Sequence, residues 1–306
     1  MRKIEQSHFK KIPEALKEAT DKYERKNSRS YPTAANEVHE DTFKSAKTDL
    51  ERIFDHKCAY CEGKGDANFH YEVEHYRPKS FTRKKEDNHH KDYKGYYWLA
   101  HEWSNFLLAC RRCNGKKSER FPLENNDEQQ RIIQPLKKNN IVTLDILDYQ
   151  VLEKPLLLHP VYDGDVIDQH IWFSKFAKVE VKNNSQKGET SIFWYDLNRY
   201  HLISERFDVI EDILLGISKS HLKYHPLSEA QIKFLLDNIL DKLEHQIKEA
   251  KKPFITFRKA VLINFKEFVI ERKIIIKAGE KEIEIPQKDL WIKCVEEKLN
   301  KHLKKD

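Results

Sequence analysis

The last third of the chain carries the most regular pattern of hydrophobic and polar positions. Between residues 201 and 272, apolar side chains return every three or four positions, which is the spacing of one face of an α-helix. Two such runs are Ile210, Ile213, Leu214 and Ile217, and then Ile232, Leu235, Leu236, Ile239 and Leu243. Residues 273–286, which contain Gly279, predict a β-hairpin, and residues 290–303 predict a final helix. We therefore expect a helical region with one hairpin over residues 201–306.

The first 57 residues predict a helical arm. Pro13 suits a first helical turn, and Ala15, Leu16 and Ala19 follow it as an apolar stripe. A second helix is predicted from about Glu40 to Asp55. Its apolar side consists of Phe43, Ala46, Leu50, Ile53 and Phe54.

Residues 58–125 have a different pattern, which predicts a compact core of their own. The segment Phe69–His75 alternates and is rich in aromatic and β-branched residues, so it predicts a strand, and Pro78 ends it. Residues 79–94 form a polar, basic insertion that predicts a surface loop. A helix is predicted to begin just after Cys113.

Residues 126–200 predict a mixed α/β extension. Strands are expected near residues 156–160 and within 171–181, and residues 183–188 predict a turn. The whole chain is therefore expected to have an α+β fold, in which a small core is embedded in a mainly helical protein. We find no internal repeat and no glycine-rich phosphate loop, so an intrinsic nucleotide-hydrolysing site is not expected.

Composition and charge indicate where the protein is located and what kind of partner it contacts. The apolar runs are too short to span a bilayer and the first residues lack the apolar segment of a signal peptide, so we expect a cytoplasmic protein with reduced thiols. The formal net charge is +6. Residues 58–121 hold 13 Lys and Arg against 9 Asp and Glu, whereas residues 122–306 are neutral. Excess positive charge in this stretch favours contact with phosphates, although a lysine-rich chain varies this much by chance.

Four of the five cysteines form two CxxC pairs, Cys58 with Cys61 and Cys110 with Cys113. This spacing lets two thiolates reach one ion, and two such pairs complete a tetrahedral four-sulfur zinc site. The alternative is a redox motif or unrelated buried thiols. Because four thiolates close the coordination sphere, this zinc would be structural and would hold together the ends of a small polar stretch. Cys294 is expected to be an ordinary buried cysteine.

An acid and a histidine stand together between the two cysteine pairs. His75, as a neutral imidazole, can take a proton from water near pH 7. Glu74 and Asn114 offer the hard oxygen ligands that Mg²⁺ or Mn²⁺ prefers. Each of these residues alone would be read as structural. It is their order relative to the cysteines that indicates a catalytic site.

This order resembles the HNH endonuclease family, which has a ββα-metal core. The resemblance covers residues 58–121 and implies roles for matching positions. His75 matches the general base and Glu74 the metal-binding acid, which is usually Asp in the family. Asn105 matches the asparagine that orients the histidine, and Asn114 the last metal ligand. The basic residues around them are then expected to bind nucleic acid: Arg77, Lys79, Arg111, Arg112, Lys116 and Lys117.

The wider chain is more loosely similar to PtuB-type HNH proteins of the Septu and retron anti-phage defence systems. The supporting segments are residues 1–4, residues 157–160 and residues 197–206. The resemblance implies an ATPase partner encoded nearby, for which residues 201–306 would be a docking surface. His159, Asp163, Asp165, Asn198 and Arg199 are more simply read as turn, cap and surface residues.

These observations predict a metal-dependent endonuclease of anti-phage defence, with DNA favoured over RNA as substrate. Zinc would be structural, and Mg²⁺ or Mn²⁺ would be catalytic. The alternative is a non-catalytic zinc module that binds nucleic acid, in which Glu74, His75 and Asn114 are incidental. A further alternative is a nuclease that stays silent until its partner docks.

Overall fold

A computed structural model describes residues 1–64, 70–80, 95–124, 131–224, 226–271, 274–276, 281–283 and 285–302. The chain forms two compact units. The first contains residues 1–172 and 180–198, and the second contains residues 173–179 and 199–306. The mixture of helices and small two-stranded sheets agrees with the predicted α+β class.

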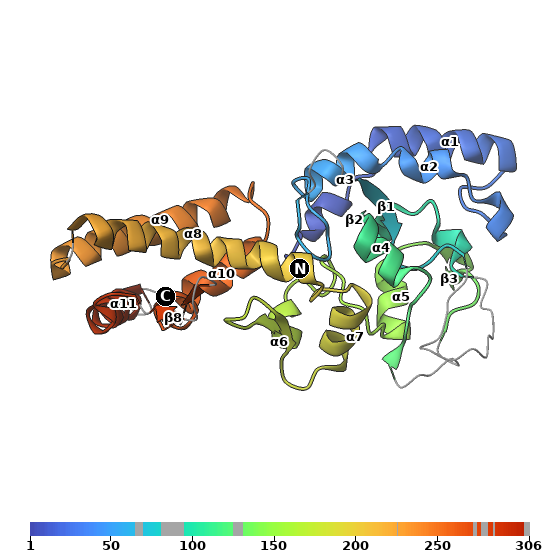
Figure 1. Ribbon diagram of the computed structural model, residues 1–306. Helices are drawn as coiled ribbons and strands as arrows, with labels where there is room; N and C mark the ends of the chain where they lie inside the picture. Colours follow the sequence, from blue (N-terminus) through green and yellow to red (C-terminus); the bar gives the residue numbers. More distant parts are fainter. Residues whose placement is uncertain are drawn as a thin grey trace. The chain divides into compact units, whose positions relative to one another are not determined.

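The first unit is built around one antiparallel hairpin of two strands, β1 (Tyr71–His75) and β2 (Phe106–Cys110). Two helices pack against both strands, α3 (Lys47–Ile53) and α4 (Arg111–Lys117), as Figure 1 shows. Every residue of β2 is buried. The hairpin is therefore the centre of this unit. The helices packed against it determine which of its side chains reach solvent.

Further elements complete the first unit. On its N-terminal side lie the 3₁₀ turns η1 (Gln6–Phe9) and η2 (Ala35–Glu37), with α1 (Glu14–Asn27) and α2 (Glu40–Lys44). The turns η3 (Tyr97–Leu99) and η4 (Trp103–Asn105) lead into β2. After α4 come β3 (Leu136–Lys138), β4 (Ile141–Thr143), α5 (Ile146–Glu153), α6 (Ile167–His170) and α7 (Gln186–Trp194). The paired strands β5 (Ile171–Phe173) and β6 (Val179–Val181) lie where the chain passes between the units.

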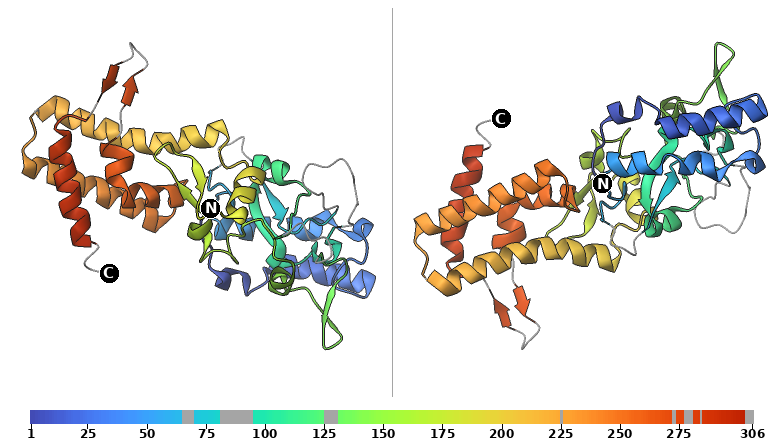
Figure 2. Two further views of the ribbon diagram at one scale, coloured as in Figure 1. Left: turned by 90° about the horizontal axis from the view of Figure 1, so that it is seen from below. Right: turned by 90° about the horizontal axis from the view of Figure 1, so that it is seen from above.

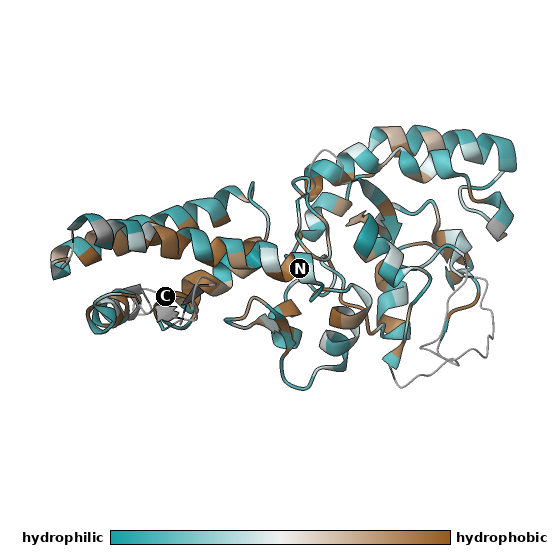
Figure 3. Cartoon of the chain, viewed as in Figure 1, coloured by the Kyte–Doolittle hydropathy of each residue, from teal (hydrophilic) through white to brown (hydrophobic). Residues whose placement is uncertain are grey.

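The second unit is mainly helical. It contains α8 (Tyr200–Tyr224), α9 (Glu229–Glu249), α10 (Ile255–Ile263), the π-helical turn η7 (Lys266–Ile270) and α11 (Lys288–His302), together with the hairpin of β7 (Ile274–Ile276) and β8 (Lys281–Ile283). Both views in Figure 2 show α11 running across the direction of α8 and α9. Apolar and hydrophilic patches alternate along α8 and α9 in Figure 3, as expected for amphipathic helices. The predicted apolar positions Ile210, Ile217, Ile232 and Leu236 are buried, which confirms the helical interpretation.

Several local predictions need correction. The helix expected from Glu40 to Asp55 is two helices, because the chain breaks at Ser45, whose hydroxyl donates to the Thr42 carbonyl. Residues 156–160 form no strand, and the neighbouring Pro155 makes only an isolated bridge with Leu123. The turn expected at 183–188 ends early, because Ser185 caps α7 by accepting from the Gly188 amide at 3.0 Å.

Some predicted segments lie outside the described residues. These are the start of the strand at Phe69, residues 81–94 of the basic insertion, and the end of the last helix at Leu303.

Candidate metal centre and active site

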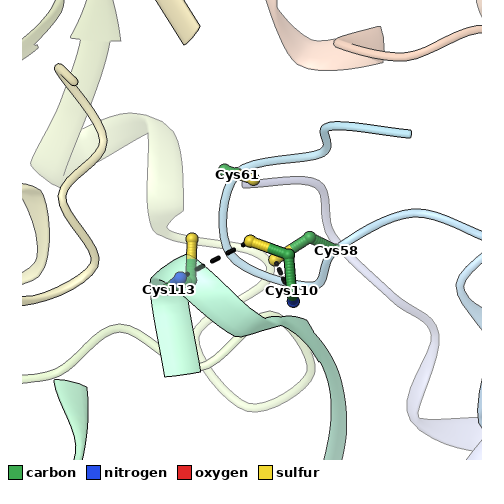
Figure 4. Close-up of side chains that lie close together, drawn as sticks. All are labelled: Cys58, Cys61, Cys110 and Cys113. Carbon is green, nitrogen blue, oxygen red and sulfur yellow. Dashed lines mark hydrogen bonds between the residues drawn. The ribbon is translucent and has the colours of Figure 1, made fainter. Parts of the chain in front are cut away.

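The four paired cysteines meet at one buried point. Their sulfur atoms all lie within 4.8 Å of one another. Cys58 and Cys61 come from the loop after α3, Cys110 ends β2, and Cys113 lies in the first turn of α4 (Figure 4). Zinc–sulfur bonds of about 2.3 Å in a tetrahedron place the sulfurs about 3.8 Å apart, so this cluster fits a zinc ion after small adjustments. The four thiols can hold such a metal.

Backbone amides support the sulfurs of this cluster. The Cys110 amide donates to Cys58 Sγ at 3.3 Å, and the Cys113 amide donates to Cys110 Sγ at 3.4 Å. Hydrogen bonds from Cys113 and Cys58 lower the pKa of Cys110, whereas burial raises the pKa of Cys58. Cys110 also serves as the N-cap of α4, so the helix starts at Arg111 and not after Cys113 as predicted. Cys294 lies apart on α11 and is buried.

Glu74 is a buried carboxylate held by a buried lysine. The register of the hairpin places it opposite Leu107, and 4% of its surface is exposed. Its Oε1 lies 2.6 Å from Lys117 Nζ and 3.4 Å from the Tyr60 hydroxyl. Burial raises the pKa of Glu74, and the ammonium of Lys117 opposes this effect. Among the described residues, Oε2 of Glu74 has no hydrogen-bond partner.

His75 ends β1 and is held in one tautomer. Its Nε2 lies 3.0 Å from the carbonyl oxygen of Ala100, so Nε2 must carry the proton and Nδ1 keeps its lone pair. The ring stands edge-on to Phe43 and Phe106. Burial lowers the pKa of His75 to about 3, and the nearby Lys79 acts in the same direction. The imidazole is therefore neutral at physiological pH, and no described residue occupies Nδ1.

Asn105 lies beside the histidine but does not contact its ring. Its side chain accepts from the Arg77 amide at 2.8 Å and donates to the carbonyls of Arg77 and Leu99. The Asn105 carbonyl accepts from the amide of Tyr76. Asn105 thus fixes the chain that follows His75, together with the turn that leads to Ala100.

Asn114, which was predicted to bind one metal ion together with Glu74, lies on α4 and pairs with Glu72. Its side-chain amide donates to Glu72 Oε2 at 2.5 Å, on the exposed part of the hairpin. Glu72 precedes Glu74 by two positions, so both carboxylates leave the same face of β1. That period of two was the available sequence signal for Glu72, which our prediction missed. The prediction likewise missed Tyr60 and the Ala100 carbonyl, for which the sequence gives no distinctive signal.

The predicted nucleic-acid contacts divide into exposed and buried residues. Arg111, Arg112 and Lys116 are exposed on α4, and Lys79 is half-buried with its ammonium 4.8 Å from the centre of the Phe43 ring. Arg77 and Lys117 have no exposed surface. The guanidinium of Arg77 pairs with buried Glu153, and Lys117 pairs with Glu74 and donates to the His75 carbonyl at 3.0 Å. In the folded chain these two residues are placed to hold the core and not to contact a phosphate.

Fold and site together define an α+β protein with a four-cysteine centre that can bind a metal. No protein-family model and no solved structure matches the chain. Among the described residues, no helix has both the length and the apolar character needed to cross a membrane.

Comparison with characterised proteins identifies the relatives of the chain. It is 33% identical to Septu protein PtuB of Bacillus mycoides (strain KBAB4) over 244 residues, which cover 76% of this chain and 77% of the relative. It is also 29% identical to Septu protein PtuA of the same strain over 164 residues, but these cover 53% of this chain and only 20% of the longer relative. The chain belongs to the PtuB family of Septu proteins.

Proposed function

We propose that this protein is an HNH endonuclease that hydrolyses phosphodiester bonds in an anti-phage defence system of the Septu type. The observation that carries the proposal is the state of His75. An imidazole with an unoccupied Nδ1 follows a carboxylate directly, at the end of a hairpin whose second strand leads into α4. Burial lowers the pKa of His75 to about 3 and makes it a weak base, so the proposal requires this pKa to rise when nucleic acid binds. Family membership supports the defence role.

His75 acts as the general base in this proposal. Its Nδ1 takes a proton from water, while the Ala100 carbonyl holds Nε2–H and stabilises the imidazolium that forms. Phe43 and Phe106 keep the ring from turning away. Asn105 orients the histidine indirectly, because its side chain holds the backbone at Arg77, after His75, and at Leu99, before Ala100.

Glu74 and Asn114 are the proposed ligands of a catalytic divalent ion. Glu74 Oε2 and the amide oxygen of Asn114 are hard donors that suit Mg²⁺ or Mn²⁺. Such an ion, when bound, would stabilise negative charge on the attacked phosphate and on the leaving oxygen. The four-cysteine site would hold zinc and would fix the loop after α3 against β2 and α4, with no part in the chemistry.

An ATPase partner is the second part of the proposal. The chain has relatives of two kinds, PtuA and PtuB, in one strain, which supports a two-component system. The second unit exposes several large apolar residues that a partner could cover: Leu215, Tyr224, Phe234 and Ile263. Activity that appears only with the partner present would agree with this arrangement.

The test is cleavage of a panel of DNA and RNA substrates with Mg²⁺ or Mn²⁺, with and without the neighbouring ATPase. General-base catalysis contributes about 10²- to 10⁴-fold, so His75→Ala should reduce cleavage by that factor. Zinc content and thermal unfolding should match the unaltered protein, which separates lost chemistry from lost folding. Equal cleavage by the His75→Ala variant would refute the assignment.

A non-catalytic zinc module is the competing function. The pairing of Glu74 with Lys117, and of Asn114 with Glu72, favours it, because both predicted metal ligands already have protein partners. Metal-dependent cleavage in the panel decides against this alternative. Binding of nucleic acid without cleavage, in the presence of the partner and both metals, decides for it.

A further inference from the structure

Helix α4 and the turn after it carry four cations that form no ion pair with any carboxylate of the described residues. Arg111, Arg112 and Lys116 are exposed, and Arg120 is half-buried. Within the described part of the chain, none of the four forms an ion pair, whereas Lys44, Arg52, Lys138 and Lys187 all do. Arg112 and Lys116 are four positions apart on one helix, a spacing at which like charges repel. Such an arrangement is stabilised when an external anion lies across it.

Two of these cations lie over aromatic rings of α7, which packs against α4. Lys116 Nζ is 5.0 Å from the centre of the Phe193 ring, and the guanidinium of Arg120 is 4.4 Å from the centre of the Trp194 ring. Trp194 is buried, but Phe193 is 45% exposed. The exposed ring of Phe193 on α7 therefore lies next to the cations of α4, although the two helices are distant in sequence.

This surface adjoins the proposed active site. Lys116 and Lys117 are consecutive on α4, and Lys117 reaches Glu74 while Lys116 reaches Phe193. A zinc ion with four thiolates would carry a net charge of −2 and would offset Arg111 and Arg112, which lie between Cys110 and Cys113. Lys116 and Arg120 lie further along the chain and face α7, so they are the cations best placed for an external ligand.

We infer that the α4–α7 surface binds a single-stranded segment of nucleic acid, with an unpaired base stacked on Phe193 and phosphates on Lys116 and Arg120. Cations that follow the backbone, combined with an exposed aromatic ring, are the recognition chemistry of single strands, because every base has a face that can stack. A duplex hides its base faces and would gain only the phosphate contacts. This inference deepens the proposed function and rests on it for the choice of nucleic acid as the ligand.

Binding can be measured without cleavage. The parent is the full chain carrying His75→Ala, without added divalent ions, and the probes are fluorescein-labelled oligo-dT, oligo-rU and a DNA duplex of equal length. Fluorescence anisotropy should show tighter binding of both single strands than of the duplex. Because one stacked base is worth about 1–3 kcal/mol, Phe193→Ala should weaken single-strand binding by about 5- to 150-fold. Phe193→Trp should retain binding and Phe193→Leu should lose it.

Matched controls separate stacking from charge and from folding. Phe176 is 57% exposed between β5 and β6, so Phe176→Ala should leave binding unchanged. Lys116→Ala should reduce the slope of log affinity against log salt by about 0.7, whereas Lys182→Ala on the exposed loop before α7 should not. Duplex binding equal to single-strand binding, or Phe193→Leu binding as tightly as Phe193→Trp, would overturn the inference. Absence of nuclease activity would leave these results unaffected and would count against the proposed function alone.

Discussion

The four-cysteine cluster and the Glu74–His75 site lie on the same hairpin and helix, yet they differ in how far the protein alone assembles them. The four sulfurs converge within 4.8 Å without any metal. The two predicted oxygen ligands are instead divided between two pairs, Glu74 with Lys117 and Asn114 with Glu72. The cysteine site, which can hold a metal, is therefore complete in its ligand set, whereas both predicted ligands of the proposed catalytic site have protein partners, one buried and one exposed.

The largest effect that tests this comparison comes from opening the cysteine cluster. Cys110→Ser removes one thiolate ligand, while the serine hydroxyl can still cap α4. We therefore expect loss of zinc and, through it, a loss of stability large enough to unfold the first unit. Metal analysis and thermal unfolding measure the two effects. Cys294→Ser, a buried cysteine on α11, should leave zinc content unchanged. A folded, zinc-free Cys110→Ser variant would show that the cluster is not structural.

Breaking the Glu74–Lys117 pair should have the next largest effect. Lys117→Met leaves a buried carboxylate without its cation, which costs about 3–5 kcal/mol of unfolding free energy. Lys116→Met, one position earlier but exposed, should change stability by less than about 0.5 kcal/mol. Chemical denaturation of both variants measures the difference. Equal stabilities would mean that Lys117 does not hold the site together.

Lowering the pH should have a smaller effect on the unfolding free energy, because of His101, the residue after Ala100. Burial lowers the pKa of His101 to about 4, so the unfolded chain binds a proton near pH 6.5 that the folded chain refuses until about pH 4. Stability should therefore fall as the pH drops through this window, by about 1.4 kcal/mol per unit for this group at full slope. His101→Phe should reduce the slope of unfolding free energy against pH between pH 6.5 and pH 4 by about this amount, while His75 continues to contribute there. If the slope of unfolding free energy against pH were the same in both proteins, the lowered pKa of His101 would be contradicted.

The sequence predicted some features well because their signals are local. The period of apolar residues places α8 and α9, and the two CxxC pairs identify the cysteine cluster. The alternation before Pro78 predicts β1. For the helices and the strand, neighbours within a few positions determine the outcome, whereas the cysteine cluster is recognised from two local CxxC patterns that meet over a long separation.

Other features depend on contacts between distant segments, which no local pattern encodes. The Lys117–Glu74 pair joins positions 43 apart along the chain, and Arg77 is buried because Glu153 of α5 meets it. A basic residue next to a motif is equally compatible with a phosphate contact and with a buried ion pair. Only the packing of α4 and α5 against the hairpin decides between them.

The central claim is that one small core holds two separate metal sites of different kinds. Manganese binding followed by electron paramagnetic resonance, together with zinc analysis of the same sample, tests it most directly. Glu74→Gln should abolish manganese binding while one zinc ion per chain remains, and Glu189→Gln, an exposed residue of α7, should change neither. If Glu74→Gln kept manganese binding intact, Glu74 would not be a ligand of the second site, and if it lost zinc along with manganese, the two sites would not be separate.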